Sequence, residues 1–169
     1  MTDLPEFHRL FDRRQIGPKP VELTANAPEC AALARRFGLV SIGRLSARIT
    51  LQADGDIIAA SGVLHASVVQ SCAVSGDDLP VTIKEPLTLR FVPERPITAE
   101  ELELEEGELD EIAYDGHSFD LGEAVAQSLA LAIDPYACGP EAEQAREKAG
   151  LNRPPEDGPF AALAALRKH

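Results

Sequence analysis

The sequence has no tryptophan, only 5% aromatic residues and three cysteines in 169 residues. Aromatic side chains provide the stacking platforms of single-stranded nucleic-acid binders, so their scarcity argues against a base-stacking site. Glycine-rich phosphate loops are also missing, which excludes the common nucleotide-binding loops. No run approaches the roughly 18 apolar residues of a membrane-spanning helix, and we therefore expect no membrane role.

Basic residues are outnumbered, with 16 Lys and Arg against 28 Asp and Glu, and the net charge is −12. Affinity for a phosphate backbone comes largely from Lys and Arg that displace counterions, so this charge disfavours stable RNA binding and favours a basic protein partner. Residues 1–15 lack the apolar stretch and cleavage site of a secretory signal. We therefore expect a cytoplasmic protein with reduced thiols.

Hydrophobic periodicity predicts an α+β fold. Three stretches of alternating polarity between Leu39 and Val92 predict an antiparallel β-meander, with the Asp54-Gly55 pair marking a hairpin turn. Two helices with apolar stripes, over residues 27–37 and 120–133, are expected to cover this sheet, and a charged third helix follows at 141–149. The expected fold is an antiparallel sheet covered by two or three helices.

Composition divides the chain into three parts. Residues 1–25 are predicted to form an N-terminal arm, because prolines at its end forbid a continuous helix. Residues 26–150 are predicted to form a single α+β domain with an acidic loop at about 97–116. Residues 151–169 combine a Pro-rich linker with a short amphipathic tail.

The acidic loop and the tail are the predicted partner-binding segments. The stretch from Ile97 to Gly116 holds nine carboxylates and no Lys or Arg, which is typical of a solvated loop. Through Glu103, Glu105 and Glu106 it would engage a basic ribosomal or ribosome-assembly protein. In the tail, three apolar residues share one helical face and would form a second contact; they are Phe160, Leu163 and Leu166.

Direct RNA contact is the alternative function. It would use five arginines from the N-terminal arm and the first strand of the meander, namely Arg9, Arg13, Arg14, Arg44 and Arg48. Such binding would weaken steeply with salt, whereas a solvated basic segment without a ligand would show no such affinity.

Cysteine chemistry gives two weaker alternatives. Cys72 and Cys138 lie in Gly-containing turns, where zinc ligands often occur, but structural zinc usually takes four ligands and each turn offers one sulfur. We therefore expect no cofactor. A small hydrolase built on Cys72 or His117 is the other alternative, although His65 lies on the strand face opposite Cys72 and no small-molecule substrate is expected.

Several segments carry a resemblance to a known family. They are the strand from Val63 to Gln70 that leads into Cys72, the Ser118-Phe119-Asp120-Leu121 segment, the turn from Pro135 to Cys138 and the tail from Pro159 to Lys168. In this order the chain resembles the YceD family, the large ribosomal RNA subunit accumulation proteins, from about residue 40 onward. The acidic insertion is similar in position. Many relatives carry C-x-x-C where this chain has Cys72 and Ser75.

The resemblance implies a non-enzymatic cytoplasmic factor that supports accumulation of large-subunit ribosomal RNA and hence ribosome assembly. If relatives hold a metal with paired cysteine turns, Ser75 implies that this site is lost or weakened here. The molecular mechanism is not implied by the resemblance, and the acidic composition favours contacts with protein.

Overall fold

The computed structural model describes residues 6–94 and 111–151. The chain divides into two compact units, one formed by Met1–Gln70 with Pro80–Asp134 and the other by Ser71–Leu79 with Pro135–His169. The expected single domain over residues 26–150 is thus split between two units. The reason is a contact between segments distant in the sequence, because the turn at residues 71–79 hydrogen-bonds with the segment after residue 135, as from the Ala73 amide to the Ala137 carbonyl at 3.0 Å.

The described strands are β1 (Leu10–Asp12), β2 (Val21–Thr24), β3 (Ser41–Asp54), β4 (Ile57–Ser71), β5 (Asp78–Pro93), β6 (Glu111–Tyr114) and β7 (Ser118–Asp120). The described helices are α1 (Ala27–Phe37), α2 (Leu121–Ala132), α3 (Ala142–Lys148) and the 3-10 helix η1 (Arg13–Gln15).

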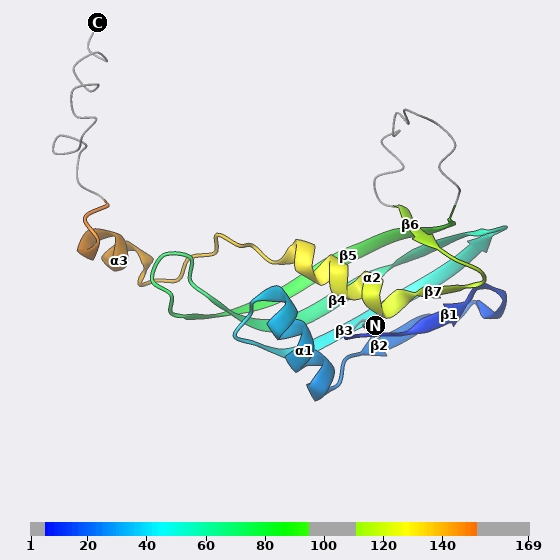
Figure 1. The fold of residues 1–169 in the computed structure, drawn as a ribbon, viewed down its shortest axis with the longest axis horizontal. Coiled ribbons are helices and arrows are strands. Elements are labelled where there is room, and N and C mark those ends of the chain that lie inside the picture. Colours follow the sequence, from blue (N-terminus) through cyan, green and yellow to red (C-terminus); the bar gives the residue numbers. More distant parts are fainter. Residues whose placement is uncertain (1–5, 95–110, 152–169) are drawn as a thin grey trace, which may run out of the picture. The chain divides into compact units, whose positions relative to one another are not determined.

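A five-stranded sheet in the order β2-β3-β4-β5-β6 forms the frame of the larger unit (Figure 1). β3 and β4 pair antiparallel, and Gly55 closes their turn at a φ of 60°, which glycine adopts without strain. β5 lies next to β4, and the connection at residues 72–77 is too short for a parallel crossover. The predicted antiparallel meander is therefore confirmed.

β6 was not predicted. It pairs in parallel with the last residues of β5, from Arg90 opposite Glu111 to Pro93 opposite Tyr114. The loop predicted over about 97–116 is therefore wrong for residues 111–114. Burial of apolar side chains in this strand outweighs the local excess of carboxylates. Tyr114 is buried, and its hydroxyl donates to the Asp56 carbonyl. Residues 95–110 lie outside the described part of the chain.

The predicted N-terminal arm is also corrected, because residues 6–25 belong to the larger unit. β1 pairs antiparallel with β7, and β2 pairs antiparallel with β3. Phe7 is fully buried in the core. Pro18 and Pro20 forbid a helix, as the sequence indicates, but they leave the flanking residues free to form strands.

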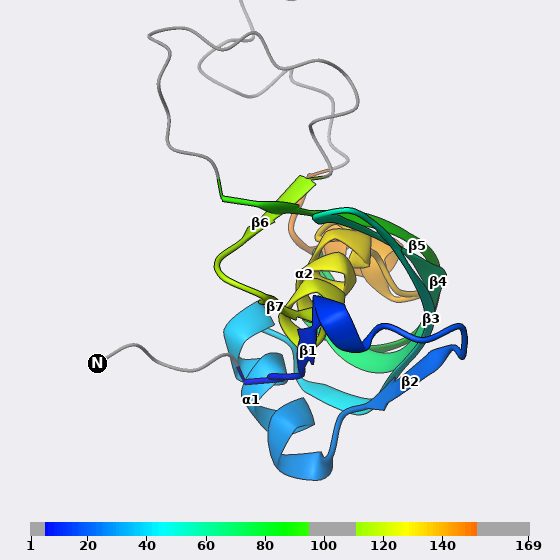
Figure 2. The same ribbon diagram turned by 90° about the vertical axis from the view of Figure 1, so that its right-hand side faces the viewer.

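α1 and α2 have the expected ends. Asn26 caps α1 in a reciprocal capping box with Glu29, and Gly38 ends the helix at a φ of 66°. Asp120 caps α2, its side chain accepting from the Glu123 amide. Both helices lie on the same, concave side of the sheet (Figure 2). Their apolar stripes and the inward residues of β3, β4 and β5 form one core.

Phe119 of β7 is the centre of an aromatic cluster in this core. Its ring lies 4.6 Å from that of Phe91 and 6.2 Å from those of Phe11 and Tyr114, between ring centroids. The Ser118-Phe119-Asp120-Leu121 segment therefore supplies a core aromatic residue, a helix cap and the fully buried Leu121. Its part in this unit is structural.

Candidate functional site

A groove runs between α2 and β5 in the larger unit. It consists of two adjoining hollows of about 320 and 210 Å³, which share Leu89, Ser128 and Leu131. Pro86 and Leu87 border the first hollow, and other residues complete the second; these are Glu111, Ile112, Ala124 and Gln127. We call this surface the α2–β5 groove.

Leu131 is the most conspicuous residue of the groove, because its side chain is 89% exposed. It lies two residues after the buried Leu129, which places it about 200° around the helix from that residue. The core therefore cannot cover it. Sequence reasoning assigned the apolar stripe of α2 correctly but missed Leu131, and a leucine off the stripe is the signal that could have identified it.

The edge of β5 beside the groove is open over part of its length. In the described residues, β6 pairs only with Arg90–Pro93, so the preceding residues of β5 have no partner strand on that side. Pro86 removes one amide donor from this stretch, as its position in a strand suggested. Glu85 and Glu111 line the groove, and because Glu111 pairs with Arg90 at 3.3 Å, Glu85 supplies the negative charge of this border.

The five predicted arginines fall into two groups. Those near the N-terminus are engaged in ion pairs: Arg9 binds Glu29 through two hydrogen bonds of 2.8 and 2.9 Å, Arg13 pairs with Asp56 and Arg14 with Asp12. They are therefore partly neutralised and do not form a joint basic surface.

Arg44 and Arg48 form the second group and lie near each other on the sheet. Both are exposed on β3, and with His65 of β4 they line a single hollow of about 200 Å³. Of the two, only Arg48 has an ion-pair partner among the described residues, Glu22 at 3.9 Å. The structure thus brings together two of the five predicted residues and adds His65.

Cys72 lies in the smaller unit, in the turn after β4, with its side chain buried. Its sulfur accepts hydrogen bonds from the amides of Ser75 at 3.4 Å and Gly139 at 3.3 Å. Hydrogen bonding from Ser75, and then from the Gly139 amide, lowers the pKa of the Cys72 thiol to about 6. The turn therefore favours a thiolate held by backbone amides.

Among the described residues, the groups around Cys72 complete neither a zinc site nor the active site of a hydrolase. In the described part of the chain, no histidine hydrogen-bonds with the Cys72 sulfur, and Cys138 is an exposed free thiol that contacts the Tyr136 carbonyl. Within residues 6–94 and 111–151, no group of three or more His, Cys, Asp or Glu side chains could hold a metal ion. His117, in the larger unit, contributes its carbonyl to a hydrogen bond with the Arg13 amide.

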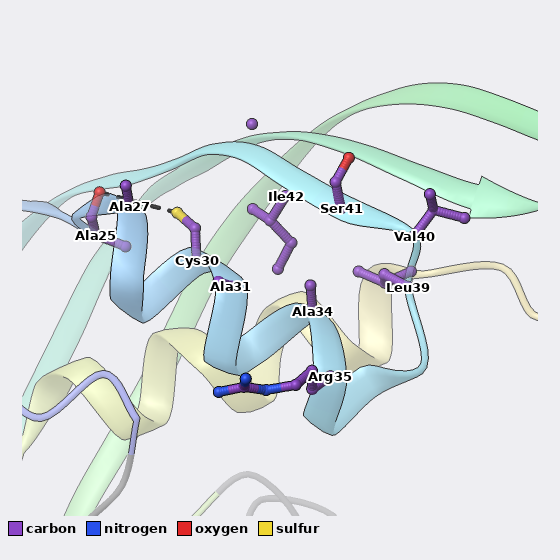
Figure 3. Close-up of a pocket in the computed structure, with 11 residues that line it drawn as sticks. Ala25, Ala27, Cys30, Ala31, Ala34, Arg35, Leu39, Val40, Ser41 and Ile42 are labelled. Carbon is purple, nitrogen blue, oxygen red and sulfur yellow. Dashed lines mark hydrogen bonds between the residues drawn. The ribbon is translucent and has the colours of Figure 1, made fainter.

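A further hollow of about 420 Å³ lies between α1 and the start of β3 (Figure 3). Most of the residues that line it are small, and Cys30 directs its sulfur to the Ala25 carbonyl at 3.9 Å (Figure 3). Burial raises the pKa of the Cys30 thiol, which keeps it protonated. Arg35 is the one charged residue of the lining, so the hollow has no acid–base pair.

The remaining predicted site residues lie outside the described part of the chain. They are Glu103, Glu105 and Glu106 of the acidic segment and Phe160, Leu163 and Leu166 of the tail. Among the described helices, none is long and apolar enough to cross a membrane.

Comparison with known proteins gives one match. The family described as "Large ribosomal RNA subunit accumulation protein YceD" matches residues 60–167, which is more than half of the chain. No curated protein and no solved structure matches significantly. The matched region includes β4 from residue 60 onward, the Cys72 turn, the Ser118–Leu121 segment, the turn from Pro135 to Cys138 and the tail up to Arg167, which are the segments that carried the resemblance in the sequence. The chain therefore belongs to the YceD family of large ribosomal RNA subunit accumulation proteins.

Proposed function

We propose that this protein is a non-enzymatic cytoplasmic factor that supports large-subunit assembly by binding a basic, extended segment of a ribosomal or ribosome-assembly protein in the α2–β5 groove. Family membership supports the role in accumulation of large-subunit ribosomal RNA. The mechanism through protein contact rests on the groove, and the observation that carries it is the 89% exposure of Leu131 beside an open strand edge.

An exposed leucine alone needs no explanation, but this one belongs to a continuous surface. Leu89 of β5 and Ile112 of β6 lie in the same groove as Leu131. Apolar side chains gathered in a groove with a polar border are typical of a protein-binding site, because a partner that covers them removes their apolar surface from water.

The open edge of β5 determines the form of the partner. An extended peptide can add a strand to an exposed sheet edge, where main-chain hydrogen bonds provide affinity and side-chain hollows provide specificity. β6 shows that this side of β5 accepts a strand, because it pairs there over four residues. A partner strand would continue along β5 next to Leu131.

The charges around the groove favour a basic partner. Glu85 and Glu111 line it, and Glu94 follows directly after β5. Arg90 is paired with Glu111 at 3.3 Å, so these two charges largely offset each other, and Glu85 and Glu94 carry the negative charge of the groove. The acidic segment, with Glu103, Glu105 and Glu106, follows β5 in the sequence and would supply further negative charge to the same partner. The tail residues Phe160, Leu163 and Leu166 are proposed as a second apolar contact.

The test is site-specific photo-crosslinking in nuclease-treated lysate. A benzophenone amino acid at position 131 should crosslink to basic ribosomal or assembly proteins, identified by mass spectrometry. The same probe at position 10 is the control, because Leu10 is also exposed (58%), belongs to the larger unit and does not line the groove. Crosslinks to such proteins that are equal at both positions, or absent at position 131, would refute the proposal.

A matched substitution completes the test. Leu131→Glu should reduce binding of the purified, crosslinked partner at least tenfold, whereas Leu10→Glu should leave it unchanged. Removal of residues 159–169 measures the contribution of the tail. Unchanged affinity of Leu131→Glu would exclude the groove as the binding site even if the tail deletion weakens binding.

A further inference from the structure

A second surface lies on the sheet face opposite α1 and α2, which we call the outer face (Figure 2). Along β3, β4 and β5, buried residues that belong to the core alternate with more exposed residues whose side chains lie on the outer face. Among the described residues of the larger unit, both α-helices cover the other face, so these exposed side chains have no helix above them.

Three basic side chains gather on the outer face. Arg44 and Arg48 lie four residues apart on β3 and therefore share its outer side with Ser46, which stands between them. His65 of β4 lies directly opposite Ser46 in the antiparallel register. Side chains that face each other in such a pair are about 5 Å apart at Cβ, so His65 stands beside Ser46, at a position along the strands between Arg44 and Arg48.

Two hollows give this cluster a shape. One, of about 370 Å³, is lined by Arg44, His65, Ser67 and Thr82, and the other, of about 200 Å³, contains Ser46 and Arg48. Arg44 and His65 belong to both hollows, which are thus continuous. Hydroxyl groups therefore alternate with cationic side chains along the surface.

The cluster has a net positive charge although the whole chain is acidic. Glu22 is the single carboxylate in the lining of either hollow. Its oxygen is 3.9 Å from Arg48 Nε, and both side chains are about 70% exposed, so this pair contributes little and can exchange for another anion. Arg44 has no ion pair with any described residue.

The chemistry of these groups suits phosphate oxygens. Guanidinium groups form two parallel hydrogen bonds to phosphate, and imidazole and hydroxyl groups donate further ones. No Phe, Tyr or Trp lines either hollow, so the surface lacks the large aromatic platforms on which bases most often stack. The surface therefore fits the sugar–phosphate backbone of a nucleic acid better than its bases.

We infer that the outer face, through Arg44, Arg48 and His65, binds the phosphate backbone of ribosomal RNA. The inference deepens the proposed function and rests on it for the identity of the RNA, but it uses a different surface from the α2–β5 groove. A factor with both surfaces would hold a basic protein segment and RNA together during assembly. The net charge of −12 limits the binding to close range and makes it sensitive to salt.

Salt-dependent binding to purified RNA tests the inference. The full-length protein is titrated into a labelled transcript of a large-subunit RNA fragment, and separately into polyuridine, at about 50 and about 200 mM salt. Binding to both RNAs at the lower salt, weakened at the higher salt, is expected. No binding at the lower salt would overturn the inference.

Charge reversal locates the site. Arg44→Glu with Arg48→Glu should weaken RNA binding at least tenfold and reduce the salt dependence by one to two phosphate contacts. The control is Arg35→Glu, which reverses the charge of an exposed arginine of α1. Each single reversal, at either place, changes the net charge by the same amount. If Arg35→Glu lowers RNA affinity as much as each reversal on the outer face does, the loss reflects total charge and the proposed RNA site is refuted. Thermal unfolding of each variant confirms that it is folded.

Two further measurements distinguish RNA binding on the outer face from binding of an acidic protein there and from binding in the α2–β5 groove. Polyglutamate at matched charge should compete poorly with RNA, and equally good competition would assign the face to acidic proteins instead. Leu131→Glu should keep its RNA affinity, while the double arginine variant should keep the crosslink at position 131. These measurements thus distinguish a failure of the RNA-binding inference from a failure of the proposed protein binding in the α2–β5 groove.

Discussion

Arg36 of α1 and Glu123 of α2 join the two helices through a pair of hydrogen bonds, 2.9 Å from Nη1 and 2.7 Å from Nη2. Arg36 Nη1 also donates to Glu6 at 3.0 Å. One guanidinium thus connects three segments that are distant in the sequence. The Glu123 side chain is 19% exposed and that of Arg36 34%, so water screens the pair only in part.

Arg36→Ala should lower the free energy of unfolding of the larger unit by about 1 kcal/mol, because Glu123 and Glu6 lose a charged donor and α1 loses its link to α2. Urea unfolding followed by circular dichroism measures the change. Arg35→Ala is the control, since this neighbouring side chain has no ion pair with the described residues, and it should change stability by less than about 0.5 kcal/mol. Equal effects of the two substitutions would contradict the prediction.

Stability should also fall in acid because of two carboxylates. Hydrogen bonds from Arg36 lower the pKa of Glu123, and those from Arg9 lower the pKa of Glu29. A carboxyl with a lower pKa in the folded state adds stability above its unfolded pKa of about 4.3, and this stability is lost as the pH falls through the folded value. The urea midpoint should therefore decrease below about pH 4.3, and less steeply in Arg36→Ala. The same slope in both proteins would argue against the Glu123 contribution.

Gly62→Ala should destabilise the sheet by about 3 kcal/mol, at the upper end of typical overpacking costs. A Cβ at position 62 would lie 2.1 Å from the Arg48 carbonyl oxygen and 2.8 Å from the Ile49 Cα, and these backbone atoms of β3 cannot move without breaking the pairing with β4. Gly43→Ala is the control, because the nearest heavy atom would lie 3.8 Å away. Calorimetry of both variants compares their melting temperatures, and a small loss for Gly62→Ala would show that β3 and β4 can separate locally.

Cys72 should titrate near pH 6. A variant that keeps only this cysteine, with Cys30→Ala and Cys138→Ala, isolates its thiolate absorbance near 240 nm. Because hydrogen bonds from Ser75 and Gly139 lower the pKa in the folded state, the stability that they add is present above the unfolded pKa of about 8.5 and is lost as the pH falls through about 6. A midpoint near 8.5 in the folded protein would show that these hydrogen bonds do not hold the thiolate.

Local sequence signals located the two helices and the three long strands of the larger unit. The alternation in β3 and β4, the Asp54-Gly55 turn and the caps at Asn26, Gly38 and Asp120 are interactions between residues near in sequence. Four strands were missed, β1, β2, β6 and β7, because each has four or fewer residues and is fixed by pairing with a strand distant in the sequence. The division into two units was missed for the same reason, since it depends on contacts between the Cys72 turn and the segment after Pro135.

The α+β class, the caps of α1 and α2 and the family follow from the sequence, because these features depend on local pattern and on motifs. Which arginines are paired depends on the tertiary structure. Arg9, Arg13 and Arg14 find carboxylates on other elements or nearby, whereas Arg44 is left exposed beside His65. It also decided that Leu131 borders the open edge of β5. Both surfaces combine residues from different elements of the fold, and a local sequence pattern does not specify which of these residues lie side by side.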